Sequence, residues 1–128
     1  MKIQVLHEAF SICRLRRMPA AGKRWHFLAV TDEEISLVCP TAEAPKEAEK
    51  RDDGWRAFRV EGTLDFSLVG ILADLSSRLA AARIGLFAVS TYNTDYILTK
   101  DKDFDRALAV LTDAGYAVEP LSEKTVEL

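Results

Sequence analysis

The feature that most constrains the fold is an apolar stripe in the second half of the sequence. Within residues 66–84, apolar side chains recur at the three- and four-residue spacing that places them on one face of a helix. The stripe consists of Leu68, Leu72, Leu75, Leu79 and Ala82. This spacing predicts a core-facing helix, with Thr63 or Asp65 as its N-cap and Gly85 at its C-terminal end.

Strands are predicted on both sides of this helix, followed by a second helix. The strand segments are short, apolar or alternating, and they cover 56–62, 86–91, 96–100 and 116–121. The second amphipathic helix is predicted over 102–115, with Asp103 as N-cap and with Phe104, Leu108 and Leu111 facing inward. The resulting order, β-α-β-β-α-β, is that of a ferredoxin-like unit.

The first half of the sequence repeats this plan with a part missing. It predicts a strand, a loop, a two-stranded hairpin and a polar connector, over 3–15, 16–24, 25–40 and 41–54 respectively. The loop, marked by Pro19 and Gly22, stands where the first helix would be. We therefore predict an α+β fold of two ferredoxin-like units in tandem. Residues 1–54 form the unit that lacks its first helix, and residues 55–128 form a complete one.

Composition limits the classes of function. With 128 residues, 48% apolar and 29% charged, the sequence is typical of a globular protein of one ordinary domain or two small ones. The net charge of −3 gives no bulk attraction to nucleic acid or to an anionic membrane. No apolar run approaches the roughly 18 residues of a membrane span, and the N-terminus lacks the features of a signal peptide, so we expect a cytoplasmic protein. No glycine-rich phosphate-binding motif is present, and no cofactor is predicted.

The cysteines, histidines and basic residues each leave one alternative open. Cys13 and Cys39 lie in apolar runs and are predicted to be reduced core residues, with a disulfide or redox pair as the alternative. His7 and His26 are isolated, so no metal site is predicted. The basic run of residues 14–24 is typical of a solvated loop, and the alternative is contact with an acidic partner or RNA.

Residues 90–95 carry more hydrogen-bonding capacity than a tight turn requires. They read Ser-Thr-Tyr-Asn-Thr-Asp between two apolar arms, without glycine or proline. Residues 62–67 lead into the N-terminus of the predicted helix, where backbone amides favour a carboxylate. Asn93 and Asp95 suit an ammonium group, so the two segments together suit a free amino acid. The alternative is that these are ordinary strand and turn residues.

Two strings carry a resemblance to a known family. VEGTLDFSLVG at 60–70 and STYNTDYIL at 90–98 resemble the small tandem ACT-domain proteins of the CASTOR-like branch, which are related to the regulatory part of aspartate kinases. The family implies modules that bind amino acids or other small metabolites where two units meet. It also implies which residues bind the ligand: Thr63, Leu64, Asp65, Phe66, Ser67, Gly70, Ser90, Thr91, Tyr92, Asn93, Thr94 and Asp95.

The predicted function is a regulatory or sensor module that binds an amino acid or a similar small zwitterion and has no catalytic activity. Without a catalytic domain of its own, such a module acts in trans on a protein partner or only binds its ligand. Homodimerisation is one way for units of this size to bury more surface. The alternatives are a small enzyme that uses Asp95 or Asp65 as an acid or base, and a protein-interaction module built on the basic loop and Trp25.

Overall fold

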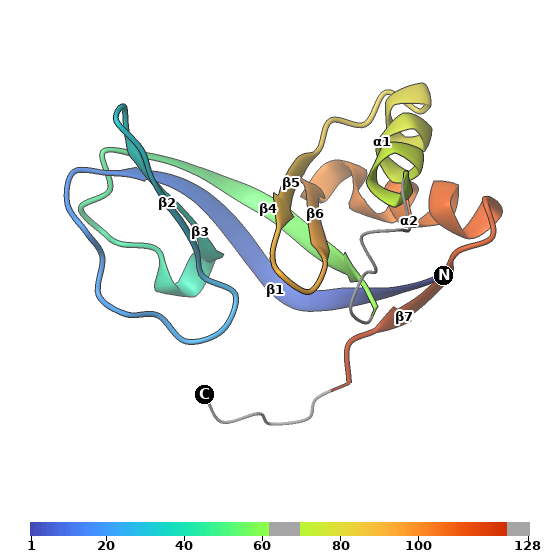
Figure 1. Cartoon of the computed structure of the whole chain (residues 1–128), viewed down its shortest axis with the longest axis horizontal. Coiled ribbons are helices and arrows are strands. Elements are labelled where there is room, and N and C mark those ends of the chain that lie inside the picture. Colours follow the sequence, from blue (N-terminus) through green and yellow to red (C-terminus); the bar gives the residue numbers. More distant parts are fainter. Residues whose placement is uncertain (62–69, 123–128) are drawn as a thin grey trace. The chain divides into compact units, whose positions relative to one another are not determined.

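A computed structural model describes residues 1–61 and 70–122 of the chain, and these form two compact units (Figure 1). The C-terminal unit contains Met1–His7 and Arg56–Ser122, and the N-terminal unit contains Glu8–Trp55. Two long strands, β1 (Lys2–Leu15) and β4 (Lys50–Val60), contribute residues to both units. The division after Trp55 lies next to the predicted boundary at 54. The first seven residues, however, belong with the C-terminal unit and not with the unit predicted over 1–54.

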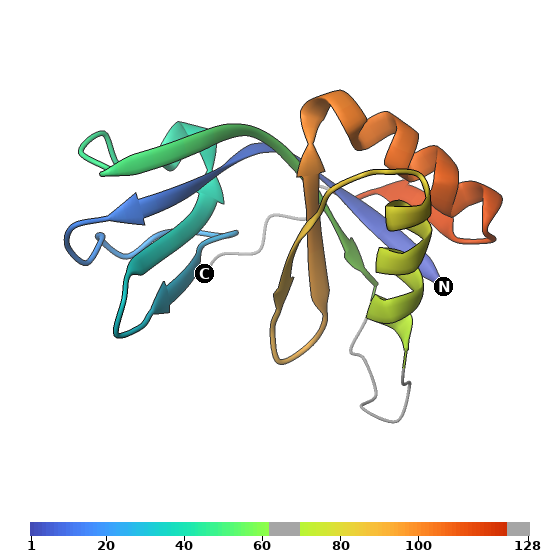
Figure 2. The same ribbon diagram turned by 90° about the horizontal axis from the view of Figure 1, so that it is seen from above.

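The C-terminal unit is a sheet covered by two helices. Its other elements are α1 (Ile71–Ala81), β5 (Phe87–Ser90), β6 (Asp95–Lys100), α2 (Asp101–Asp113) and β7 (Ala117–Pro120). The strand order is β7-β1-β4-β6-β5, in which β7 is parallel to β1 and β5 is antiparallel to β6. Figures 1 and 2 show both helices on the same face of this sheet. The predicted α+β fold with two long helices is confirmed for the described residues.

The core of this unit lies between the sheet and the helices. The strands contribute buried Ile3, Phe58, Val60 and Ile97, and the helices contribute buried Leu75, Leu79, Phe104, Ala107 and Leu111. Leu75 and Leu79 belong to the predicted stripe, so the sequence periodicity identified the buried face correctly. Burial of Ile3 shows why residues 1–7 join this unit: the first strand supplies part of its core and pairs with β7 from Lys2 to Val5.

The helix boundaries differ from those predicted. The described helix α1 begins at Ile71, with Gly70 as N-cap at φ +96°, whereas the predicted N-caps Thr63 and Asp65 lie outside the described residues. It ends at Ala81, before the predicted stop at Gly85, because Arg83 adopts a left-handed φ of +60°. The amide of the next residue, Ile84, then donates to Leu79 O at 2.9 Å, which closes the helix in a Schellman motif.

Helix α2 ends in the same motif with the expected glycine. Gly115 has φ +100°, and the amide of Tyr116 donates to Leu111 O at 3.0 Å. At the other end the predicted N-cap is wrong, because the helix begins at Asp101 and Lys100 is the N-cap. Asp103 lies in the first turn instead, where a carboxylate is favoured by the helix dipole, and it pairs with Arg106 at 3.1 Å.

The N-terminal unit is a four-stranded sheet. It adds β2 (Phe27–Val30), β3 (Ile35–Pro40) and the short 3₁₀ helix η1 (Thr41–Glu43) to segments of β1 and β4. The strand order is β2-β3-β1-β4, and β3 is antiparallel to both β1 and β2. All residues of Glu8–Trp55 are described, and none of them lies in an α-helix. A loop therefore stands at the first place where the C-terminal unit has a helix, and η1 followed by a loop stands at the second.

The predicted connector over 41–54 is wrong at its C-terminal end, because β4 already begins at Lys50. The side chains at this end are charged, but pairing with a neighbouring strand satisfies the backbone whatever the side chains are. The amide of Glu49 donates to Arg14 O at 2.9 Å, and Arg51 pairs with Asp53 at 2.7 Å. Composition indicated a loop here, and tertiary pairing overrides it.

Both cysteines lie in the small core of the N-terminal unit, together with Leu15 and Leu37. Cys13 and Cys39 are free thiols with 2% and 0% of their surface exposed, as predicted for reduced core residues. Burial raises the pKa of both thiols, that of Cys39 to about 12.

Among the described residues, no helix is long and apolar enough to cross a membrane.

Candidate functional site

The candidate site is built on the loop that joins β5 to β6. Thr91 begins this four-residue loop, and its amide donates to Thr94 O at 2.8 Å. Its hydroxyl donates to the same carbonyl at 3.1 Å and accepts from the Thr94 amide at 3.4 Å. The threonine side chain therefore closes the loop, which explains how it turns without glycine or proline.

The hairpin of the N-terminal unit is closed in the same way. Thr31 donates its amide to Glu34 O at 2.9 Å, and its hydroxyl accepts from the amides of Glu33 and Glu34 at 3.1 Å. The two hairpins also match in length, since β2 and β5 each have four residues and β3 and β6 each have six. The comparison indicates that Thr91, like Thr31, uses its hydrogen-bonding groups to form the turn, so part of the hydrogen-bonding capacity of 90–95 is structural.

Thr94 ties the hairpin to the end of β4. Its side chain is buried, with 6% of the residue exposed, and its hydroxyl donates to Val60 O at 2.8 Å. Val60 is the last residue of β4, and the chain continues from there towards α1. Figure 1 shows the hairpin tip at the same end of the sheet as the end of β4. The sequence linked 90–95 to 62–67 only by hypothesis. In the structure, 90–95 contacts Val60, at the end of the strand that precedes 62–67.

The other residues of the loop differ in how much they can offer a ligand. Ser90 donates its hydroxyl to Asp95 Oδ1 at 2.5 Å, and Asp95 is half-buried. Tyr92 is 84% exposed, and Asn93 is exposed as well. Asp95 retains a second carboxylate oxygen, so a phenol, an amide and a carboxylate surround the tip of the hairpin.

The N-terminus of α1 is the second part of the candidate site. Gly70 makes no side-chain cap, and the first amides of the helix carry the positive end of its dipole. Such a terminus favours a carboxylate. The predicted ligand-binding residues of the preceding loop, Thr63, Leu64, Asp65, Phe66 and Ser67, lie outside the described residues.

One polar cluster near α1 was not predicted. Asp74 Oδ2 accepts from the hydroxyl of Tyr116 at 2.5 Å and from Arg78 Nε at 3.0 Å. The hydrogen bond from Tyr116, which has the larger effect, and that from Arg78 hold the pKa of Asp74 below its usual value. Burial and the Asp74 carboxylate raise the pKa of Tyr116 to about 12. The i, i+4 spacing of Asp74 and Arg78 was visible in the sequence, but nothing in it indicated that Tyr116 would join them.

A second such cluster lies on β4. Arg59 Nε donates to Gln4 Oε1 at 2.8 Å, and its Nη1 donates to the hydroxyl of Tyr96 at 3.2 Å. Alternation along β4 predicted that Arg59 lies on the face opposite Phe58 and Val60, but it did not indicate these partners. For metal binding, residues 1–61 and 70–122 hold no group of three or more His, Cys, Asp or Glu side chains suited to an ion.

Comparison with known proteins agrees with this fold. A family model described as ACT domain matches residues 50–113. Protein Atu0741 from Agrobacterium tumefaciens has a similar structure, with a TM-score of 0.85 and 28% identity over 98% of this chain and 97% of that chain. VC0802 from Vibrio cholerae, a protein of unknown function, has a TM-score of 0.64 and 17% identity over 88% of both chains. No curated protein sequence matches.

The third comparison is with aspartate kinase. The enzyme from Synechocystis has a TM-score of 0.66 and 16% identity over 98% of this chain, which corresponds to 28% of the kinase chain. At this identity the likeness shows a shared fold. ACT domains are generally small-molecule-binding regulatory modules, as in the regulatory part of aspartate kinases. Because the family model covers half of the sequence, the chain belongs to the ACT domain family.

Proposed function

We propose that the chain is a regulatory module that binds a free amino acid or a similar small zwitterion and acts in trans on a partner protein, without catalysis of its own. The observation that carries this proposal is the buried hydrogen bond from Thr94 to Val60 O, at 2.8 Å. It fixes the polar hairpin tip against the strand that leads to α1. The ammonium group of an amino acid needs acceptors, its carboxylate needs donors, and the two sets must lie close together. This contact supports a pair of neighbouring surfaces, one for each group.

Each surface suits one charge of the ligand. Asp95 and Asn93 provide oxygen acceptors for the ammonium group, and Tyr92 provides an exposed ring and hydroxyl beside them. The amides at the start of α1, after Gly70, suit the carboxylate. Residues 63–67 complete the site in this proposal, as the family resemblance implies.

The N-terminal unit supports a tandem arrangement of the CASTOR-like kind. In a ferredoxin-like unit the strands lie in the order fourth, first, third, second. Read from β4, the strands of the N-terminal unit lie in the order β4-β1-β3-β2, which is the same order. Its hairpin also has the strand lengths and the threonine of the other hairpin. In our proposal it is a reduced ACT-like unit in which loops replace both helices.

The experiment is calorimetric titration of the protein with the twenty amino acids, repeated on Asp95→Asn. Asparagine keeps an oxygen that accepts from Ser90, so the hairpin should fold as before. Loss of the charge should weaken binding by on the order of 2 kcal/mol, about thirtyfold. Asp105→Asn is the matched control, because it makes the same change on the exposed face of α2 and should leave affinity unchanged.

Two results would contradict the proposal. If no amino acid binds, the ligand class is wrong. If Asp95→Asn and Asp105→Asn bind equally well, Asp95 is not the partner of the ammonium group. Conversion of a bound ligand into a product would favour the alternative of a small enzyme, and mass spectrometry of the titrated ligand tests for it.

A further inference from the structure

Two neighbouring cavities lie in the N-terminal unit, between the loop of residues 16–26 and the segment 41–49. One has a volume of about 140 Å³ and the other of about 310 Å³. They share four lining residues, Met18, Pro19, Pro45 and Glu47, so they are adjacent, and we call the two together the loop cleft. All of its lining residues belong to the N-terminal unit.

Within the N-terminal unit, the loop cleft lies over the face of the sheet that corresponds to the helix-covered face of the C-terminal unit. Leu37 of β3 and Ile97 of β6 are the third residues of strands that follow matching hairpin loops. Ile97 packs in the core with residues of α1 and α2. Leu37 packs with Cys13, Leu15 and Cys39, and it also lines the larger cavity. In place of the helices the two loops bury this face, leaving 2% of Leu37 exposed, and the cleft lies in the space between the loops.

The far end of the cleft is held in a defined geometry around His26. Its Nε2 lies 3.3 Å from Glu43 Oε1, and only 16% of its side chain is exposed. The ring packs so closely against Gly22 that a Cβ at that position would overlap it. The preceding residue, Trp25, has φ +65°, which is unfavourable for a large side chain. Strained backbone of this kind is found where surrounding structure holds a site in one conformation.

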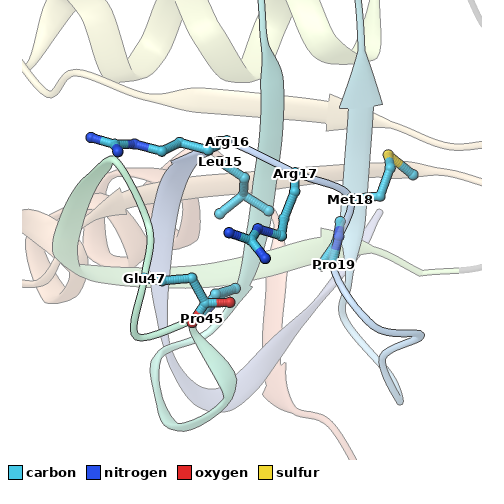
Figure 3. A pocket seen from close by; sticks show the side chains of 7 residues that line it. All are labelled: Leu15, Arg16, Arg17, Met18, Pro19, Pro45 and Glu47. Atoms are coloured by element: carbon cyan, nitrogen blue, oxygen red, sulfur yellow. The ribbon is translucent and has the colours of Figure 1, made fainter.

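Two opposite charges face each other in the smaller cavity. Figure 3 shows the side chains of Arg17 and Glu47 directed into it, with Leu15, Pro19 and Pro45 around them. Arg16 also lines this cavity, but its guanidinium extends away from it. Nearby charges of the unit are used in ion pairs, such as Arg14 with Glu49 at 3.6 Å. Among the described residues, no ion pair engages either charge of the smaller cavity.

We propose that the loop cleft binds a free α-amino acid with an apolar side chain, such as leucine or methionine. Arg17 binds the carboxylate through its planar guanidinium, and Glu47 binds the ammonium group. The side chain of the ligand lies in the larger cavity, against Met18 and Leu37. A ligand of roughly ten non-hydrogen atoms suits micromolar to millimolar affinity. This site is separate from the one around 90–95, and it does not depend on it.

The test is titration of the full chain with leucine, with isocaproate, which lacks the ammonium group, and with isoamylamine, which lacks the carboxylate. Leucine should bind saturably, and both analogues should bind at least about tenfold more weakly, since each leaves one charge without a partner. Arg17→Gln and Glu47→Gln should each weaken leucine binding about tenfold. Arg16→Gln is the matched control, and it should change affinity less than about threefold, because the guanidinium of Arg16 extends away from the cavity.

Backbone amide chemical shifts locate the binding site in the same titration. Saturable shifts should appear in residues 16–26 and 43–47, and they should persist in Asp95→Asn. The proposal is wrong if leucine gives no saturable shifts there, if shifts are confined to 90–95, or if Arg16→Gln and Arg17→Gln weaken binding equally. The second of these results would leave the proposed function intact and remove only the loop cleft. Unchanged thermal melts of the ligand-free variants show that each remains folded.

Discussion

Thr94 offers a sharp test of how the hairpin is held. Replacing it with valine keeps the shape of the side chain and removes the hydroxyl that donates to Val60 O at 2.8 Å. The residue is only 6% exposed, so water cannot easily take the place of the lost donor. The buried carbonyl then loses this partner, and the loss of such a partner costs about 1–3 kcal/mol.

The expected loss of unfolding free energy is about 1–2 kcal/mol, because the new methyl group recovers part of the cost through apolar burial. For a unit of this size, each kcal/mol corresponds to roughly 4–8 °C in Tm. Thr99→Val is the matched control. Thr99 is fully buried on β6, the strand that follows Thr94, and its hydroxyl donates to Lys100 O at 3.4 Å. That marginal bond predicts a change below about 0.5 kcal/mol.

The structure also selects the assay. Both described α-helices belong to the C-terminal unit, so far-UV circular dichroism follows the unfolding of that unit. The two tryptophans, Trp25 and Trp55, belong to the N-terminal unit, so their fluorescence follows the other unit. Urea unfolding of Thr94→Val should shift the dichroism transition with an unchanged m-value. A loss below about 0.5 kcal/mol, or an equal loss in Thr99→Val, would refute the assignment of this hydrogen bond.

Two further predictions follow from the perturbed pKa values. Since the pKa of Tyr116 is raised to about 12 in the folded protein and is about 10 in the unfolded chain, the unfolded state loses this proton first. The contribution of Tyr116 to the free energy of unfolding is therefore fully present below pH 10 and is lost as the pH rises towards 12. Tyr116→Phe should show a shallower fall of Tm with pH in alkaline melts. The thiols of Cys13 and Cys39 should react slowly with a thiol reagent in the native protein and rapidly in denaturant, because both are buried and have raised pKa values. Rapid native labelling of both would contradict the buried placement.

The elements that the sequence predicted correctly are those whose signal is local. The stripe containing Leu75 and Leu79 identified the buried face of α1, and Gly115 marked the end of α2. Apart from the helix ends, the failures are non-local. Charged residues from Lys50 onward form a strand because β1 pairs with them. Periodicity within a segment cannot report a partner elsewhere in the chain, and for the same reason it placed residues 1–7 in the unit predicted over 1–54 and not in the C-terminal unit, where they lie.

The candidate site shows the same limit. The polar composition of 90–95 indicated a special loop, but not how its members divide between structure and ligand. Thr91 closes the turn, Thr94 anchors it, and the side chains of Tyr92 and Asn93 are exposed. These four residues lie between β5 and β6 and not in a strand, so no alternation rule predicts which way each side chain points.

The pairing of β1 with β7 has a consequence for the order of folding during synthesis. Lys2 lies opposite Ala117, so the sheet of the C-terminal unit joins residues that are 115 positions apart in the sequence (117 − 2). All residues of the N-terminal unit, Glu8–Trp55, are translated before most of the C-terminal unit exists. The early strand segment containing Ile3 must therefore wait, without its last partner, until β7 has left the ribosome. Contacts of such large sequence separation form slowly, so this edge of β1 stays unpaired until residues 117–120 have been made.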